Sequence, residues 1–239
     1  MKDFADITCL VDRSGSMESI KGAMEEAYGT FLQKHKENPS TRITLIQFDG
    51  ENPQQVDYVN VPITAAEPLK LVPRDNTPLL DAMVTAIDNT GSRLKALEPS
   101  ERPARVLFVV ITDGQENASR HAKRSDVFNR VTKQRNDYNW EFTFFGANQD
   151  LFKETQSIGI PWQNVLKYTT DSAWVPMAAN YLAGATASYA GGASAGISYT
   201  SDARSFSATV EDQAQDSVPF DQLTPDQKIN RRSHGKGVS

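Results

Sequence analysis

Four short, nearly continuous apolar runs constrain the fold of this chain more than any other feature. They are FADITCLVD (residues 4–12), RITLIQFD (42–49), RVLFVVITD (105–113) and WEFTFFGAN (140–148). Each run is rich in β-branched and aromatic residues. Uninterrupted apolar strands of this kind are typical of parallel sheets that are covered on both faces. The chain is therefore expected to form a buried sheet.

Helical patterns fill the stretches between the apolar runs, because apolar residues recur there at three- and four-residue steps. The expected helices cover residues 17–32, 79–97, 125–138, 150–158 and 172–190. The second of them follows Pro78, a residue that suits the start of a helix. Strands that alternate with helices over short connections are typical of a Rossmann-like α/β fold.

Two further strands are expected at the margins of the sheet. The segment QQVDYVNVPI (54–63) alternates apolar and polar residues and contains Pro62, which predicts an antiparallel edge strand. Residues 164–168 are a candidate for one more short strand. The predicted fold class is therefore α/β, with an open, mostly parallel sheet, one antiparallel edge strand and helices on both faces.

The composition changes after about residue 190. Residues 184–208 are crowded with Ala, Gly and Ser, and the stretch from about Glu211 onward is polar. Such a segment buries too little apolar surface to offset the entropy lost on ordering. We expect a folded domain over residues 1–190 and a flexible tail over 191–239. The sequence leaves open whether part of the Ala/Gly/Ser tract packs on the domain.

Acidic and hydroxyl side chains follow the apolar runs at the points where the strands end. Asp12 ends the first run and opens the loop DRSGS, which adds Ser14 and Ser16. Asp113 ends the third run, and the loop RDNTPLLDA presents Thr77 just before a predicted helix. Because open α/β sheets bind ligands outside the carboxyl ends of their strands, we expect these side chains at one edge of the sheet.

Each of these residues also has a simpler interpretation when it is taken alone. Ser14 and Ser16 are suited to cap the helix that follows them. Thr77 suits a turn, and Asp113 with Gly114 is a common pair in turns. Only the occurrence of all three motifs at one edge of the predicted sheet favours a shared site.

Taken together, the three motifs resemble those of the von Willebrand factor A domain family. They are DxSxS after the first strand, Thr-Pro-Leu-Leu-Asp-Ala around Thr77, and Thr-Asp-Gly around Asp113. They match the family in kind, order and approximate separation over about residues 4–170. The resemblance implies a metal-ion-dependent adhesion site in which hydroxyls bind the metal directly and some carboxylate contacts run through water. Its implied metal ligands are Asp12, Ser14, Ser16, Thr77 and Asp113.

The chemistry of these five side chains agrees with a hard cation, Mg²⁺ or Mn²⁺. All five offer oxygen atoms, and none is His or Cys. Two carboxylates neutralise a divalent ion and three hydroxyls add no charge, so the ion keeps the capacity to bind one more anionic oxygen. The helix predicted from Met17 points its positive end toward the same edge, which favours an incoming carboxylate. The sequence therefore predicts a divalent-metal-dependent protein-binding module that captures a Glu or Asp side chain of a partner protein.

Two other functions stay open from the sequence alone. One is a Mg²⁺-dependent hydrolase at the same strand-end site, with Glu116 as the best available base. Against it, His35, His121 and His234 have neither ligand nor triad spacing, and the sequence has no P-loop and no G-x-S-x-G motif. The other is a metal-independent scaffold or adaptor whose surface binds partners without the ion.

Charge and hydropathy limit the classes of partner. The net charge of −5 argues against general affinity for nucleic acid. No stretch approaches the roughly 20 apolar residues of a membrane span, and the N-terminal sequence lacks the apolar region of a signal peptide, so we expect a cytoplasmic protein. The resemblance is to short cytoplasmic members of bacteria and their phages, and it implies adaptor roles beside an ATPase or in a larger assembly.

Overall fold

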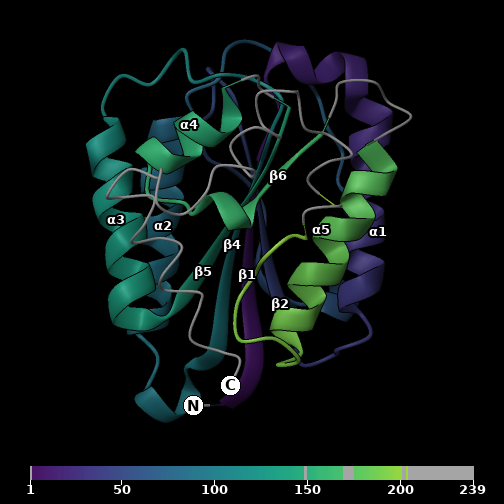
Figure 1. Cartoon of the computed structure of the whole chain (residues 1–239), viewed down its shortest axis with the longest axis vertical. Helices are drawn as coiled ribbons and strands as arrows, with labels where there is room; N and C mark the ends of the chain where they lie inside the picture. The colour runs from purple at the N-terminus through teal and green to yellow at the C-terminus, as the bar shows by residue number, and fades with distance from the viewer. Residues whose placement is uncertain (1, 148–149, 169–174, 201–202, 204–239) are drawn as a thin grey trace, which may run out of the picture.

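The computed structural model describes residues 2–147, 150–168, 175–200 and 203, which form a six-stranded sheet flanked by helices (Figure 1). The strand order is β3-β2-β1-β4-β5-β6, in which β3 runs antiparallel to β2 and the other neighbouring pairs are parallel. The predicted α/β class with one antiparallel edge strand is confirmed. The strands are β1 Lys2–Asp12, β2 Arg42–Phe48, β3 Gln55–Pro62, β4 Pro103–Thr112, β5 Trp140–Gly146 and β6 Val165–Lys167.

Helices cover both faces of the sheet, as predicted. The α-helices are α1 Lys21–His35, α2 Leu79–Lys95, α3 Arg124–Tyr138, α4 Leu151–Ser157 and α5 Val175–Ala190. Figure 1 shows α1 and α5 packed together on one face and α2, α3 and α4 on the other. Short 3₁₀ helices are η1 Gly15–Ile20, η2 Ile63–Ala65, η3 Pro99–Glu101 and η4 Trp162–Asn164. Within the described ranges, no helix combines the length and the apolar character needed to cross a bilayer.

Alternate side chains of the central strand β1 enter two separate cores. Ile7, Cys9 and Val11 pack with α1 and α5, whereas Leu10 packs with α2 and α3, and all four are fully buried. Desolvation raises the pKa of the Cys9 thiol, which is therefore an apolar core group rather than a nucleophile. Burial on both faces is the reason that β1 and β4 are continuous apolar runs in the sequence.

The helix predicted from Met17 differs in its first turn. Residues Gly15–Ile20 form the 3₁₀ helix η1, and α1 begins only at Lys21. Side chains three residues apart align in a 3₁₀ helix, so Met17 and Ile20 enter the core together. The tighter turn leaves the serines on either side of Gly15 at the edge of the sheet.

The small-residue tract beyond α5 packs in part on the core shared by α1 and α5. Ile197, Tyr199 and Ala203 are each 3% exposed. The backbone N–H of Tyr199 donates to the Gln163 carbonyl at 3.0 Å, and its hydroxyl lies 2.6 Å from Thr143 Oγ1. This answers the question that the sequence left open for that tract. The domain limit at residue 190 and the flexible tail stay predictions.

Some predicted features lie outside the described residues. They include the last residue of the fourth apolar run, Asn148, the first residues of the helix predicted over 172–190, and the tail over 201–202 and 204–239.

Candidate metal centre

The candidate site lies at the carboxyl ends of β1 and β4, in the middle of the sheet. These strands are neighbours, and Val11 pairs with Ile111, but the chain leaves them toward opposite edges of the sheet. A reversal of this kind opens the crevice in which open α/β sheets bind ligands. Asp12 is the last residue of β1, and Asp113 follows β4 directly. The fold therefore brings these two acids to the same crevice.

Hydrogen bonds join four of the five predicted ligands. The Ser16 hydroxyl donates to Asp113 Oδ1 at 2.7 Å, and Ser14 Oγ lies 3.1 Å from Ser16 Oγ. The backbone N–H of Ser14 donates to Asp12 Oδ1 at 2.7 Å. The DxSxS loop thus curls so that its acid and both hydroxyls meet the acid that follows β4.

Gly114 marks the point at which Thr77 joins the other four. A methyl group on Gly114 would lie 2.9 Å from Thr77 Oγ1 and 3.5 Å from both Asp12 Oδ2 and Ser16 Oγ. Oxygens from the DxSxS loop and from Thr77 therefore lie close to the position that a side chain at residue 114 would occupy, beside the loop that follows Asp113. The sequence predicts only a turn at Gly114 and gives no sign of this position between the ligands.

The two serines do not act as helix caps, so their simpler interpretation is wrong. Ser14 occupies the N-cap position of η1, but its side chain makes no capping hydrogen bond. The residue that precedes α1 is Ile20, which has no polar side chain to cap it. The two hydroxyls instead lie 3.1 Å from each other, and that of Ser16 donates to Asp113.

Among the described residues, the two carboxylates of the site have no positive partner. Asp12 is fully buried, and desolvation raises its pKa to about 6, while hydrogen bonds from Thr112 and Ser14 oppose the shift and the charge of Asp113 adds to it. Desolvation likewise raises the pKa of Asp113. In the described part of the chain, no Lys, Arg or His side chain forms an ion pair with either acid.

Thr112 is a supporting residue that the sequence analysis missed. Its hydroxyl donates to Asp12 Oδ2 at 2.6 Å and accepts the backbone N–H of Gly114 at 3.1 Å. It therefore fixes the Asp12 carboxylate and the start of the next loop together. Its place directly before Asp113 was the available sign.

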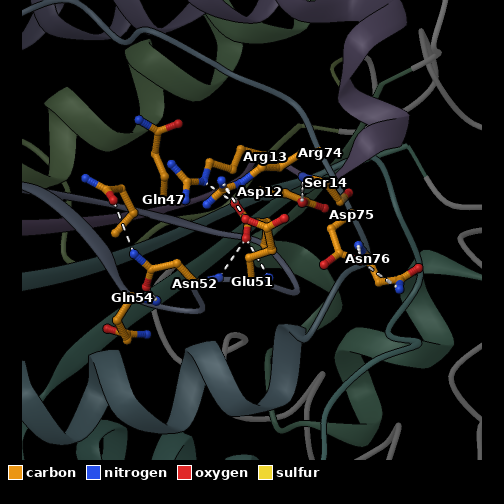
Figure 2. A network of polar contacts seen from close by, with 12 residues as sticks. Asp12, Arg13, Ser14, Gln47, Glu51, Asn52, Gln54, Arg74, Asp75 and Asn76 are labelled. Atoms are coloured by element: carbon orange, nitrogen blue, oxygen red, sulfur yellow. Dashed lines mark hydrogen bonds and ion pairs between the residues drawn. The ribbon is translucent and has the colours of Figure 1, made fainter.

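A second carboxylate, Asp49, anchors the DxSxS loop from the side of β2. Arg13 forms an ion pair with Asp49, and Arg74 Nε lies 3.0 Å from the same carboxylate oxygen. Figure 2 shows Arg13 and Arg74 converging beside Asp12 and Ser14. Asp49 follows β2 just as Asp113 follows β4, and this repeated pattern was the sign that the sequence analysis did not use.

Backbone hydrogen bonds hold the same loop between β2 and the segment that carries Thr77. The Arg13 N–H donates to the Phe48 carbonyl, and the Arg13 carbonyl accepts from Arg74 N–H, both at 2.9 Å. The Gly15 N–H donates to the Asp75 carbonyl at 2.9 Å. The positions of both serine hydroxyls are thus fixed from two sides.

The loop after Asp113 is hydrogen-bonded to the start of α2, and this contact positions Thr77. Asn117 Oδ1 accepts the Thr77 N–H at 2.9 Å, and the Asn117 N–H donates to the Thr77 carbonyl at 3.2 Å. The Glu116 carboxylate accepts the N–H groups of Leu80 and Ser119 at 2.8 and 2.7 Å. It also accepts the Ala118 N–H and the Ser119 hydroxyl.

Those residues named for a hydrolase that the structure describes do not place a free general base at this site. Glu116 is engaged by four donors, so it is a structural anchor. His35 is buried between α1 and α5, where Nδ1 contacts the Phe31 carbonyl at 2.9 Å. His121 is exposed in the loop that follows Asp113, and His234 lies outside the described residues.

The donor set fits a hard divalent cation. Within the described ranges, no group of three or more His, Cys, Asp or Glu side chains could hold a metal ion. The centre combines two carboxylates with three hydroxyls instead, which suits Mg²⁺ or Mn²⁺ because these ions take oxygen ligands and retain water. The space beside Gly114 is where such oxygens converge.

Comparison with known proteins identifies relatives of this fold. The model of the von Willebrand factor type A domain family matches residues 6–173. Proximal thread matrix protein 1 from the mussel byssus is 14% identical with a TM-score of 0.53, over 77% of this chain and 46% of that one. A von Willebrand factor type A protein from Catenulispora acidiphila is 14% identical with a TM-score of 0.53, over 78% and 43%.

The PilB minor pilin from Streptococcus sanguinis is 9% identical with a TM-score of 0.52, over 80% of this chain and 63% of that one. The match covers less than two thirds of each of these three proteins, and at such identities the likeness shows the fold alone. No curated protein is recognisably similar to the chain in sequence.

Proposed function

The chain belongs to the von Willebrand factor type A domain family, and from this premise we propose that it is a divalent-metal-dependent module that captures an acidic side chain of a partner protein. Domains of this family commonly mediate protein–protein interaction. The finer proposal concerns the metal and the acid. It rests on one observation: Thr77 Oγ1, Asp12 Oδ2 and Ser16 Oγ surround the space left by the missing side chain of Gly114.

Each residue has a distinct part in this proposal. Ser14, Ser16 and Thr77 present hydroxyls toward the ion, and Asp12 and Asp113 supply the compensating negative charge. A bound Mg²⁺ or Mn²⁺ supplies an electrophilic position for one further anionic oxygen. The Thr112 hydroxyl holds the Asp12 carboxylate in its orientation through the 2.6 Å hydrogen bond.

The hydrolase is disfavoured by the state of its candidate base. The Glu116 carboxylate accepts four hydrogen bonds, one from the Leu80 N–H at the start of α2 and three from Ala118 and Ser119 in its own loop. A general base must reach the proton that it removes, and Glu116 would have to give up these donors to do so. Turnover of phosphoester, peptide or ester substrates that requires Mg²⁺ and Asp113 would favour the hydrolase over the binding module.

The test is affinity capture with a matched pair of variants. Thr77→Val removes one hydroxyl of the site without changing the size of the side chain. Thr85→Val makes the same change on the exposed face of α2, where the hydroxyl donates only to the Asp81 carbonyl. Proteins captured by the wild type in Mg²⁺ should be retained by Thr85→Val and lost with Thr77→Val and with EDTA. Capture that survives both treatments would support a metal-independent scaffold instead.

A further inference from the structure

A basic stretch leads from the loop beside the candidate metal centre to the first residue of α3. Residues 119–124 read Ser-Arg-His-Ala-Lys-Arg, and we call them the basic loop. Arg120, His121, Lys123 and Arg124 are all exposed. The whole chain has a net charge of −5, so this stretch is opposite in sign to the chain as a whole.

The backbone of the basic loop is fixed to the first turn of α2. The Asp81 carboxylate accepts three successive N–H groups, from Arg120 at 2.8 Å, His121 at 3.1 Å and Ala122 at 2.6 Å. The Asp81 N–H in turn donates to the Ser119 hydroxyl at 3.1 Å. Although burial opposes the shift, these backbone hydrogen bonds lower the pKa of Asp81. The loop therefore presents its side chains from a defined position.

In this region the carboxylates are bonded to backbone N–H groups, whereas the basic side chains are exposed. The carboxylates of Asp81, Glu116 and Asp126 all accept backbone N–H groups of the loop or of α2. In the described part of the chain, Arg120 and Lys123 form no ion pair. Arg124 Nη2 lies 3.7 Å from Glu154 Oε1. The outer face of the loop is therefore basic.

The basic loop lies close to the metal centre. It continues from Gly114, which adjoins the space where the hydroxyls and carboxylates converge. Its anchor Asp81 lies in the first turn of α2, which begins just after Thr77. Figure 1 shows the connection into α3 at the end of the molecule where the parallel strands finish.

We propose that Arg120 and Lys123 form a second contact for the partner, which presents an acidic stretch rather than a single acid. One carboxylate of the stretch binds at the metal centre and others pair with the basic loop, so this inference rests on the proposed function. An extended peptide advances about 3.3 Å per residue, so acids within a few residues of the metal-bound one can reach a loop that lies beside the same site. The loop from Gly114 to Arg124 has no Phe, Tyr or Trp on which a base could stack, which favours an acidic peptide over nucleic acid.

The test is fluorescence anisotropy of two labelled synthetic peptides with the full chain. One peptide carries a Glu followed at its third to fifth positions by Asp, and the other has Asn at those positions. The double variant Arg120→Ser, Lys123→Ser is compared with Lys95→Ser, Lys133→Ser, which removes two exposed charges of the same sign from the far end of α2 and from α3. Thermal melting establishes that both variants are folded.

The inference predicts that, in Mg²⁺, the first variant binds the Asp peptide about fivefold more weakly than the wild type does, since each exposed charge pair contributes modestly. Its affinity for the Asn peptide and the affinities of the control variant should be unchanged. Equal affinity of the two variants for the Asp peptide would overturn the inference. It would also be overturned if wild-type protein bound a labelled single-stranded DNA more tightly than the Asp peptide and the first variant lost that binding.

The same measurements separate this inference from the proposed function. If the affinity of the wild type for each peptide is the same in Mg²⁺ as in EDTA, metal-dependent capture fails. The basic loop is then judged by the two double variants in EDTA, where the same fivefold difference supports it and equal affinity overturns it.

Discussion

Asp12 and Asp49 occupy equivalent places at the ends of neighbouring strands, but their surroundings differ in charge. Both follow an apolar run, and both are 0% exposed. Desolvation raises the pKa of Asp12 to about 6. For Asp49 burial also favours a higher pKa, but the Asn52 N–H, Arg74 and Arg13 outweigh it and lower the pKa.

The comparison shows how the structure distinguishes an anchor from a binding site. The charge of Asp49 is balanced by this chain's own arginines, so its carboxylate is complete as a structural element. The charges of Asp12 and Asp113 are balanced by nothing in the described chain, and hydroxyls rather than cations surround them. We propose that a cation from solution balances the charges of Asp12 and Asp113.

The largest expected effect is the loss of stability when Asp49 is removed. Asp49→Ala leaves the guanidinium of Arg13, which is 8% exposed, without its carboxylate. Breaking a buried ion pair by removing one partner costs about 3–5 kcal/mol, so the free energy of unfolding in urea should fall by roughly that amount. Glu51 is the other partner of Arg74, and the Glu51 side chain is 60% exposed. Glu51→Ala should therefore cost less than about 1 kcal/mol. Equal losses in the two variants would contradict the distinction.

The next effect is the pH dependence of the metal-free protein. Asp12 is protonated in both states below its ordinary pKa of 3.8, and between that value and about 6 the folded state holds the proton more tightly. Stability is therefore lost as the pH rises through this range, by up to about 3 kcal/mol for a shift of about two units. In EDTA, the unfolding free energy of the wild type relative to Asp12→Asn should fall by that amount from about pH 4 to pH 7.

His35 acts in the opposite direction over the same range. Burial lowers its pKa from 6.5 to about 4, so the folded state loses stability as the pH falls from 6.5 toward 4. This contribution is the same in the wild type and in Asp12→Asn, and it cancels in their difference. A difference that does not vary with pH would mean that Asp12 is balanced in the folded chain after all.

A smaller effect tests the space beside Gly114 without removing any ligand. Gly114→Ala places a methyl group 2.9 Å from Thr77 Oγ1, within the group of oxygens. Mg²⁺ at about 100 times its Kd should stabilise the wild type by about 2.7 kcal/mol, and this gain should disappear in the variant. Gly22→Ala on α1 meets nothing within 4 Å and should keep the full gain. Thermal melting with and without Mg²⁺ measures both, and an undiminished gain in Gly114→Ala would show that the metal does not occupy this space.

The sequence alone was sufficient to predict the strands and the burial of the apolar ones on both faces. It also predicted that the five candidate ligands lie at the carboxyl ends of the strands. Those features depend on local patterns and on the general geometry of parallel sheets. The supporting contacts were not predictable in the same way, because Arg13 meets Asp49 across 36 positions and Thr112 meets Asp12 across 100. Nothing local in the sequence reveals which side chain completes such a pair. Nor does it reveal that Thr77, Asp12 and Ser16 lie close to the missing side chain of Gly114.

Anomalous diffraction from crystals soaked in Mn²⁺ tests the central claim most directly. We predict one manganese peak surrounded by Ser14, Ser16 and Thr77, with Asp12 and Asp113 beside it and a solvent-facing side left for a carboxylate. A peak held by other residues, or none among these five at saturating Mn²⁺, would contradict it.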